Sequence, residues 1–140
     1  MANVTEIAKA ATIAYNDKNW GKVKEAFAAD AVYDEKGTRR RIQGVGQIID
    51  AWKGWATAIP DSKATFMREF ASGDTAVIEV VWKGVHKGSL QLPSGTIPAS
   101  NKPIELPACQ VLQVEGGKVK SFTHYFDMLT LLTQIGAVKG

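Results

Sequence analysis

Residues 104–126, IELPACQVLQVEGGKVKSFTHYF, contain two runs of largely apolar or β-branched residues that meet at Gly116-Gly117. Two glycines between such runs are typical of a tight β-hairpin. Another pair of runs, residues 64–70 and 75–85, flanks a Ser72-Gly73-Asp74 turn. The second half of the chain is therefore predicted to form two antiparallel hairpins.

Helical periodicity dominates the first half of the chain. The first helix is predicted from apolar residues spaced i, i+3, i+4, i+7 and i+8, with Asn3 as its N-cap: Ile7, Ala10, Ala11, Ala14 and Tyr15. Further helices are expected from Trp20 to about Ala28 and from Val45 to Ile59, and a short one from Met128 to Ile135. A short strand is predicted at residues 31–33, followed by a turn at residues 35–37. Helices followed by a run of strands predict an α+β fold, with helices packed on one sheet face.

The length of 140 residues fits a single domain, residues 1–140. No apolar run approaches the roughly 20 residues that span a bilayer, and the first residues lack the features of a secretion signal. Cys109 is the single cysteine, which excludes an internal disulfide and suggests the cytoplasm. The net charge is +3, and the basic run Arg39-Arg40-Arg41 is interpreted as a solvated surface. Neither a nucleic acid nor a membrane is expected as a partner.

Both faces of the predicted strands carry apolar residues. In residues 122–127, one face bears Phe122, His124 and Phe126, and the other bears Thr123, Tyr125 and Asp127. A sheet with one wet face should alternate more cleanly. The pattern therefore predicts a second copy of the chain on the outer face, as a homodimer or a higher homo-oligomer. Residues 87–103, rich in Gly, Ser and Pro, are expected to form a lid-like loop.

Asp127 is the first candidate for chemistry, as an inward-facing acid in a ligand pocket. Because it ends an apolar and aromatic strand, desolvation would raise its pKa towards the range of a general acid or base. The alternative is that Asp127 caps the following helix, where backbone N–H groups would lower its pKa. The residue pattern alone favours the cap.

Other candidates surround this segment. His86 ends the strand 75–85 and could donate to a substrate oxygen or be a plain loop histidine, while His124 should face away from Asp127. Tyr125 shares the Asp127 face and could stabilise an oxyanion. The remaining substrate-binding candidates, for which core packing is the alternative role, are Tyr33, Trp52, Trp82 and Gln110. Two histidines and one cysteine without ligand-like spacing argue against a metal site.

Several motifs resemble the SnoaL-like polyketide cyclase (ester cyclase) family, of the nuclear transport factor 2-like superfamily. They occur in this order over nearly the whole chain: Gly84-Val85-His86-Lys87-Gly88, Ile97-Pro98-Ala99-Ser100-Asn101-Lys102, Gly117-Lys118-Val119, Tyr125-Phe126-Asp127 and Gln134-Ile135-Gly136. The resemblance implies a cystatin-like cone, in which a curved antiparallel sheet and N-terminal helices surround a central pocket.

The resemblance also implies roles for individual residues. Asp127 matches the acid/base of an intramolecular aldol ring closure that uses no metal or organic cofactor, and His86 matches a histidine of a Gly-Thr-His-Thr-Gly-like motif. Tyr33 and Gln110 stand where the antibiotic-pathway cyclases carry Asn and His. In this interpretation Asp127 and His86 are catalytic.

The predicted function is thus a cofactor-independent acid/base enzyme, related to polyketide cyclases, for a small apolar or aromatic carbonyl compound. Two alternatives remain open. One is another Asp-based reaction in the same fold, such as isomerisation, epoxide hydrolysis or hydroxylation. The other is a non-catalytic binding module, in which helix amides hold Asp127 with a depressed pKa.

Overall fold

The computed structural model describes residues 3–138 and contains four helices and eight strands. The helices are α1 (Val4–Asn16), α2 (Trp20–Ala26), α3 (Val45–Ala58) and α4 (Met128–Gln134). The strands are β1 (Phe27–Glu35), β2 (Arg40–Gln43), β3 (Lys63–Ser72), β4 (Thr75–Val85), β5 (Leu90–Leu92), β6 (Gly95–Ile97), β7 (Pro103–Glu115) and β8 (Lys118–Phe126). None of the helices in the described residues has the length and apolar character needed to cross a membrane.

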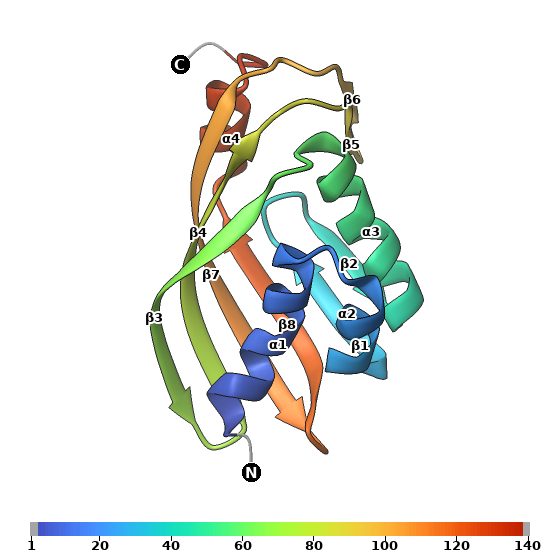
Figure 1. Cartoon of the computed structure of the whole chain (residues 1–140), viewed down its shortest axis with the longest axis vertical. Coiled ribbons are helices and arrows are strands. Elements are labelled where there is room, and N and C mark those ends of the chain that lie inside the picture. The colour runs from blue at the N-terminus through green and yellow to red at the C-terminus, as the bar shows by residue number, and fades with distance from the viewer. Residues whose placement is uncertain (1–2, 139–140) are drawn as a thin grey trace.

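Six strands form one sheet in the order β2-β1-β8-β7-β4-β3, and β5 pairs with β6 in a separate hairpin. Helices α1, α2 and α3 lie against one face of the curved sheet, while α4 and the β5–β6 hairpin lie at the end opposite the N-terminus (Figure 1). The α+β prediction is confirmed, with helices on one face of a curved sheet.

The sheet differs from the prediction in one pairing. β1 runs parallel to β8, so the sheet is mixed rather than wholly antiparallel. A parallel pair needs a long connection, and α3 with the two following hairpins supplies it. β1 is also longer than the predicted strand at residues 31–33, and β2 lies where only a basic surface run was expected.

Several local predictions are confirmed. The Asn3 side chain accepts a hydrogen bond from the Glu6 backbone N–H at 2.8 Å, as an N-cap does. Gly136 follows α4 with φ of 77°, the left-handed conformation that glycine adopts at a helix end. The predicted lid-like segment contains the β5–β6 hairpin, which was not expected.

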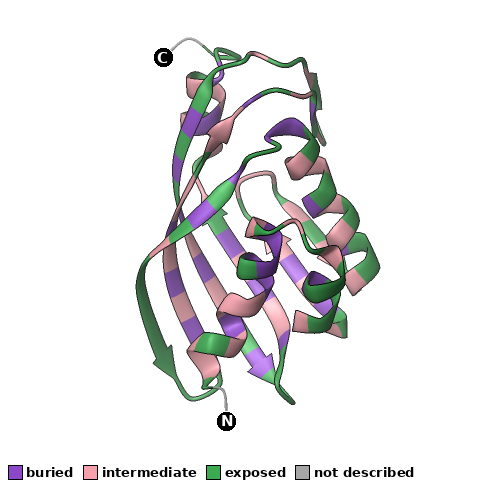
Figure 2. Ribbon diagram, viewed as in Figure 1, coloured by how far each residue is buried: buried purple, intermediate pink, exposed green. Residues whose placement is uncertain are grey.

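Burial alternates along the central strands and separates an inner face from an outer face (Figure 2). In β7 the residues at even positions from Ile104 to Val114 are buried, and those at odd positions are mostly exposed. The inner faces of β4, β7 and β8 meet the helices there. The hydrophobic core and the cavity described below lie in this layer.

Candidate functional site

A cavity of about 70 Å³ lies between the inner face of the sheet and the helices α1, α3 and α4. Its walls are mostly aromatic or aliphatic, with a few polar side chains: Thr12, Tyr15, Tyr33, Glu35, Trp52, Trp55, Ile59, Ser62, Trp82, Ile104, Leu106, Phe122, His124, Phe126 and Leu131. Enclosed apolar cavities with a few polar groups are the usual form of a small-molecule site.

The aromatic rings of the wall pack edge to face. The Tyr15 ring lies 5.8 Å from the Trp52 ring and 5.4 Å from the Trp82 ring, nearly perpendicular to both. Tyr33 and Trp52 meet at 5.6 Å in the same manner. Such pairs add about 0.5–1.5 kcal/mol each beyond area burial. Tyr33, Trp52 and Trp82, all predicted as pocket residues, thus lie in this wall.

Glu35 is completely buried beside the cavity, at the end of β1. One carboxylate oxygen accepts hydrogen bonds from Thr38 Oγ1 and the Arg40 guanidinium, and the other accepts from the Tyr33 hydroxyl and Trp55 Nε1, both at 2.9 Å. Burial alone would raise the pKa of Glu35, but the Thr38 and Arg40 contacts outweigh it and lower the pKa. Glu35 is therefore an ionised carboxylate in an apolar layer.

His124 extends this arrangement along β8. Its Nδ1 lies 2.8 Å from the Tyr33 hydroxyl oxygen, and its Nε2 accepts a hydrogen bond from Trp82 Nε1 at 3.3 Å. Burial lowers the pKa of His124 to about 4, against a smaller opposing effect of the Glu35 charge. The imidazole is therefore neutral at physiological pH and lies in the cavity wall.

The sequence interpretation missed Glu35 and set His124 aside. Glu35 was assigned to a turn, because the strand was expected to end at Tyr33. Parity could have found it, since Ala31, Tyr33 and Glu35 occupy the same face of an extended β1.

The inward-facing position predicted for Asp127 is wrong. Its side chain is exposed and lies beside an open groove on the outer face of the sheet. It caps α4, accepting from the Leu129 backbone N–H at 3.2 Å and from the Thr130 hydroxyl at 2.6 Å. The Thr130 hydrogen bond is the main cause that lowers the pKa of Asp127. The predicted alternation along β8 holds, but His124 and Phe126 take the inner face.

The other predicted residues lie elsewhere. Tyr125 is 48% exposed and lines the outer groove with Asp127. His86 is buried in the loop after β4, where its Nδ1 lies 2.9 Å from Ser100 Oγ. Gln110 is buried on the inner face of β7, opposite His124 in the strand pairing, and accepts a hydrogen bond from Thr12.

Comparison with known proteins gives one family match. The sequence model of the SnoaL-like polyketide cyclases matches residues 5–135. No curated protein sequence matches the chain.

Within residues 3–138, no group of three or more His, Cys, Asp or Glu side chains is placed to hold a metal ion.

Solved structures share the fold of this chain. A protein from Catenulispora acidiphila with a ketosteroid isomerase-like fold, crystallised with trimethylamine, is 25% identical, with a TM-score of 0.78 and coverage of 94% of this chain and 92% of that one. IdmH from Streptomyces antibioticus, a proposed polyketide cyclase, is 20% identical, with a TM-score of 0.81 and coverage of 96% and 99%. TsrD from Streptomyces laurentii is 21% identical, with a TM-score of 0.80 and coverage of 96% of both chains.

Proposed function

We propose that this chain, which belongs to the SnoaL-like polyketide cyclase family, is a proton-transfer enzyme for a small, largely apolar carbonyl compound. The reaction would be an intramolecular aldol closure or a related step that begins with loss of a proton next to a carbonyl. The observation that carries the proposal is His124, a neutral imidazole in the wall of an otherwise mainly aromatic cavity. We place the chemistry inside this cavity.

His124 Nε2 would act as the base in the first step. It takes a proton from the carbon next to the carbonyl, and the C–H electrons form an enolate. Trp82 Nε1, 3.3 Å from Nε2, is the nearest N–H donor and would turn from the imidazole to the enolate oxygen. Water-poor surroundings strengthen such a hydrogen bond.

The second step consumes the enolate. Its carbon attacks another carbonyl of the same molecule, which forms a carbon–carbon bond and leaves an alkoxide. The imidazolium returns its proton to that oxygen, so the enzyme regains its starting state. General acid–base catalysis of this kind contributes about 10²–10⁴-fold to the rate.

The family resemblance gives the acid/base role to Asp127, and this role remains a prediction. The Asp127 carboxylate is engaged with the helix amide and Thr130, outside the cavity. We therefore prefer His124 as the base. The two assignments predict opposite outcomes for one pair of variants.

Proton exchange in D₂O tests the proposal without knowledge of the natural substrate. The probe is acetophenone, whose methyl protons are next to the carbonyl, and ¹H NMR follows their loss. The wild type is expected to accelerate exchange, His124→Gln to reduce it by about 10²-fold or more, and Asp127→Asn to leave it unchanged. Binding of acetophenone, seen by tryptophan fluorescence, without any exchange by the wild type would refute the proposed function. Exchange lost in Asp127→Asn but retained in His124→Gln would return the role to Asp127.

A second candidate function is binding of a small methylated ammonium ion. Aromatic faces attract such cations, with about 0.5–2 kcal/mol per favourable contact. The cavity wall is built from tyrosine and tryptophan rings, and the Catenulispora acidiphila protein was crystallised with trimethylamine. Calorimetric titration with trimethylammonium chloride distinguishes this binding function from the proposed proton transfer. Saturable binding that Trp52→Leu abolishes, together with no proton exchange on acetophenone, would favour a binding module.

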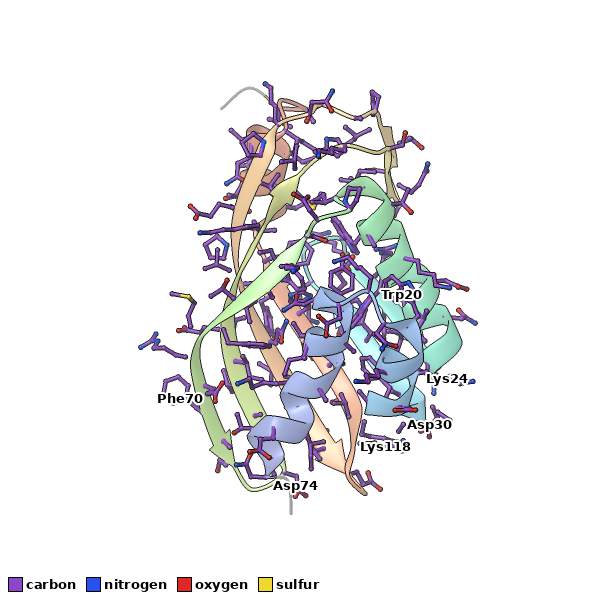
Figure 3. All side chains as sticks on the ribbon, viewed as in Figure 1. Trp20, Lys24, Asp30, Phe70, Asp74 and Lys118 are labelled. Atoms are coloured by element: carbon purple, nitrogen blue, oxygen red, sulfur yellow. The ribbon has the colours of Figure 1, made fainter. Side chains whose placement is uncertain are left out.

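We also propose that a second copy of the chain covers the outer face of the sheet. Large apolar side chains are exposed on that side, with Met67 at 59%, Phe70 at 54% and Tyr125 at 48%. Phe70 projects from β3, away from the helices (Figure 3). Exposed apolar groups at a sheet edge and face favour association.

A further inference from the structure

We infer that Glu35 acts through Tyr33 to fix the tautomer of His124, leaving Nε2 as the proton-accepting nitrogen. The catalytic consequence of this inference rests on the proposed proton transfer, but the tautomer itself does not. Glu35 is in this sense a positioning residue, because Tyr33 separates it from the imidazole.

The hydrogen bonds of Glu35 determine which atom is the donor in the Tyr33–Glu35 and Tyr33–His124 hydrogen bonds. All the groups that contact its carboxylate are donors: the Thr38 hydroxyl, the Arg40 guanidinium, the Trp55 indole N–H and the Tyr33 hydroxyl. An ionised carboxylate only accepts, so Tyr33 must donate its hydroxyl hydrogen to Glu35.

Tyr33 has no other hydrogen to give. Its oxygen therefore accepts from His124 Nδ1, 2.8 Å away, and Nδ1 carries the ring hydrogen. The opposite nitrogen, Nε2, then holds a lone pair, which agrees with its acceptance of the Trp82 N–H. Three separate contacts thus support a single tautomer.

The position of Glu35 is held by the β1–β2 hairpin. Glu35 and Arg40 are paired residues in this ladder, and the Arg40 guanidinium lies 2.8 Å from the carboxylate. The Arg40 side chain is 26% exposed, whereas Glu35 is fully buried. The hairpin therefore keeps a negative charge in the core, and that charge also stabilises an imidazolium as it forms on His124.

Glu35→Gln should reverse the tautomer of His124. The new amide must direct its NH₂ group at one of the two sets of donors, and the Arg40 side is the less favourable because it is charged. The NH₂ group would then face Tyr33 and Trp55. Tyr33 would accept from it and donate to His124 Nδ1, while the Trp55 indole N–H would lose its acceptor. The hydrogen of the neutral imidazole would move to Nε2, the Trp82 N–H would lose its acceptor there, and the proposed base would be lost.

Nuclear magnetic resonance reads the tautomer directly. Long-range ¹H–¹⁵N correlation spectra at pH 7 separate Nδ1–H from Nε2–H, and the signal missing in His124→Gln identifies His124 among the two histidines. We expect Nδ1–H in the wild type and Nε2–H in Glu35→Gln. Tyr33→Phe, a smaller change that only removes the hydroxyl, should also lose the Nδ1–H preference. Glu115→Gln, at the exposed end of β7, is the matched control and should retain it.

Two results would overturn the inference: Nε2–H in the wild type, or Nδ1–H retained in both folded variants. The acetophenone exchange rate separates this failure from that of the proposed function. If His124→Gln loses exchange while Glu35→Gln keeps the wild-type rate, Glu35 has no positioning role. If His124→Gln keeps exchange, the proposed function fails whatever the tautomer. The expected loss in Glu35→Gln is on the order of 10²–10⁴-fold, the usual contribution of general acid–base catalysis.

Discussion

At the scale of single residues, the burial of His124 makes the stability of the protein depend on pH. Burial lowers its pKa from 6.5 to about 4, so the folded state holds the imidazole neutral and the unfolded chain binds the proton more tightly. The contribution of His124 is complete above about pH 6.5 and is lost as the pH falls towards 4. From pH 7 to pH 4.5 the free energy of unfolding should drop by about 2–3 kcal/mol from this group.

Urea unfolding at several pH values measures this drop. Glu35 does not share the window, because its lowered pKa removes stability only at more acidic pH. The pKa of His86 is also lowered by burial, so both histidines contribute to the slope of the wild-type free energy of unfolding against pH. The test is therefore the difference between the wild type and His124→Gln. An equal slope for the two proteins would contradict the buried neutral state of His124.

Single residues also show what the sequence could predict of the site. Tyr33, Trp52 and Trp82 were predicted as pocket residues and line the cavity. The alternation along β8 was also predicted, but the face with Tyr125 and Asp127 was wrongly taken as the inner one. Parity gives two sets of residues and cannot choose between them, because both sets in residues 122–127 contain aromatic rings. Parity along a longer β1 could have placed Glu35 on the inner face, but its ionised state there could not be predicted, since it depends on Arg40 and Trp55, which lie outside that strand.

At the scale of elements, the loop after β4 docks on the end of α3 through a close backbone contact. The backbone N–H groups of Lys87 and Gly88 both donate to Ala58 O at 3.0 Å. A Cβ on Gly88 would lie 2.1 Å from Thr57 O, a backbone atom that cannot easily move. Gly88→Ala should therefore lower the free energy of unfolding by about 1–3 kcal/mol.

Gly54, which lies within α3, provides the control. A Cβ at Gly54 meets no atom within 4 Å, so Gly54→Ala should raise the free energy of unfolding by about 0.5–1 kcal/mol through helix propensity. Urea denaturation measures the free energy of unfolding of both variants against the wild type. A Gly88→Ala variant with an unchanged free energy of unfolding would show that the loop can leave α3 without cost.

The order of the elements was predictable because the hydrophobic period changes along the chain. The docking of the loop on α3 was not predictable, since it joins backbone atoms about 30 residues apart.

At the scale of the whole molecule, the proposed dimer explains why both sheet faces are apolar. The helices cover the inner face (Figure 1), and Met67 and Tyr125 are exposed at the groove on the outer one. Burying such side chains against a second copy would remove apolar surface from water, at about 25 cal/mol per Å². A sheet face that meets its own copy about a two-fold axis needs only one self-complementary patch.

Sedimentation velocity at about 10–100 μM tests the dimer. The wild type should sediment as a dimer, and Met67→Glu should shift it to monomer, because a charge would be buried without a partner in both copies. Ile13→Glu is the matched control, since Ile13 is 46% exposed on α1, at the helical side of the molecule. A monomeric wild type over this range would contradict the proposal, and so would an equal response of both variants. Because the cavity of each copy lies on the opposite side of its sheet, Met67→Glu should leave acetophenone exchange intact, which makes assembly and chemistry separable in one protein.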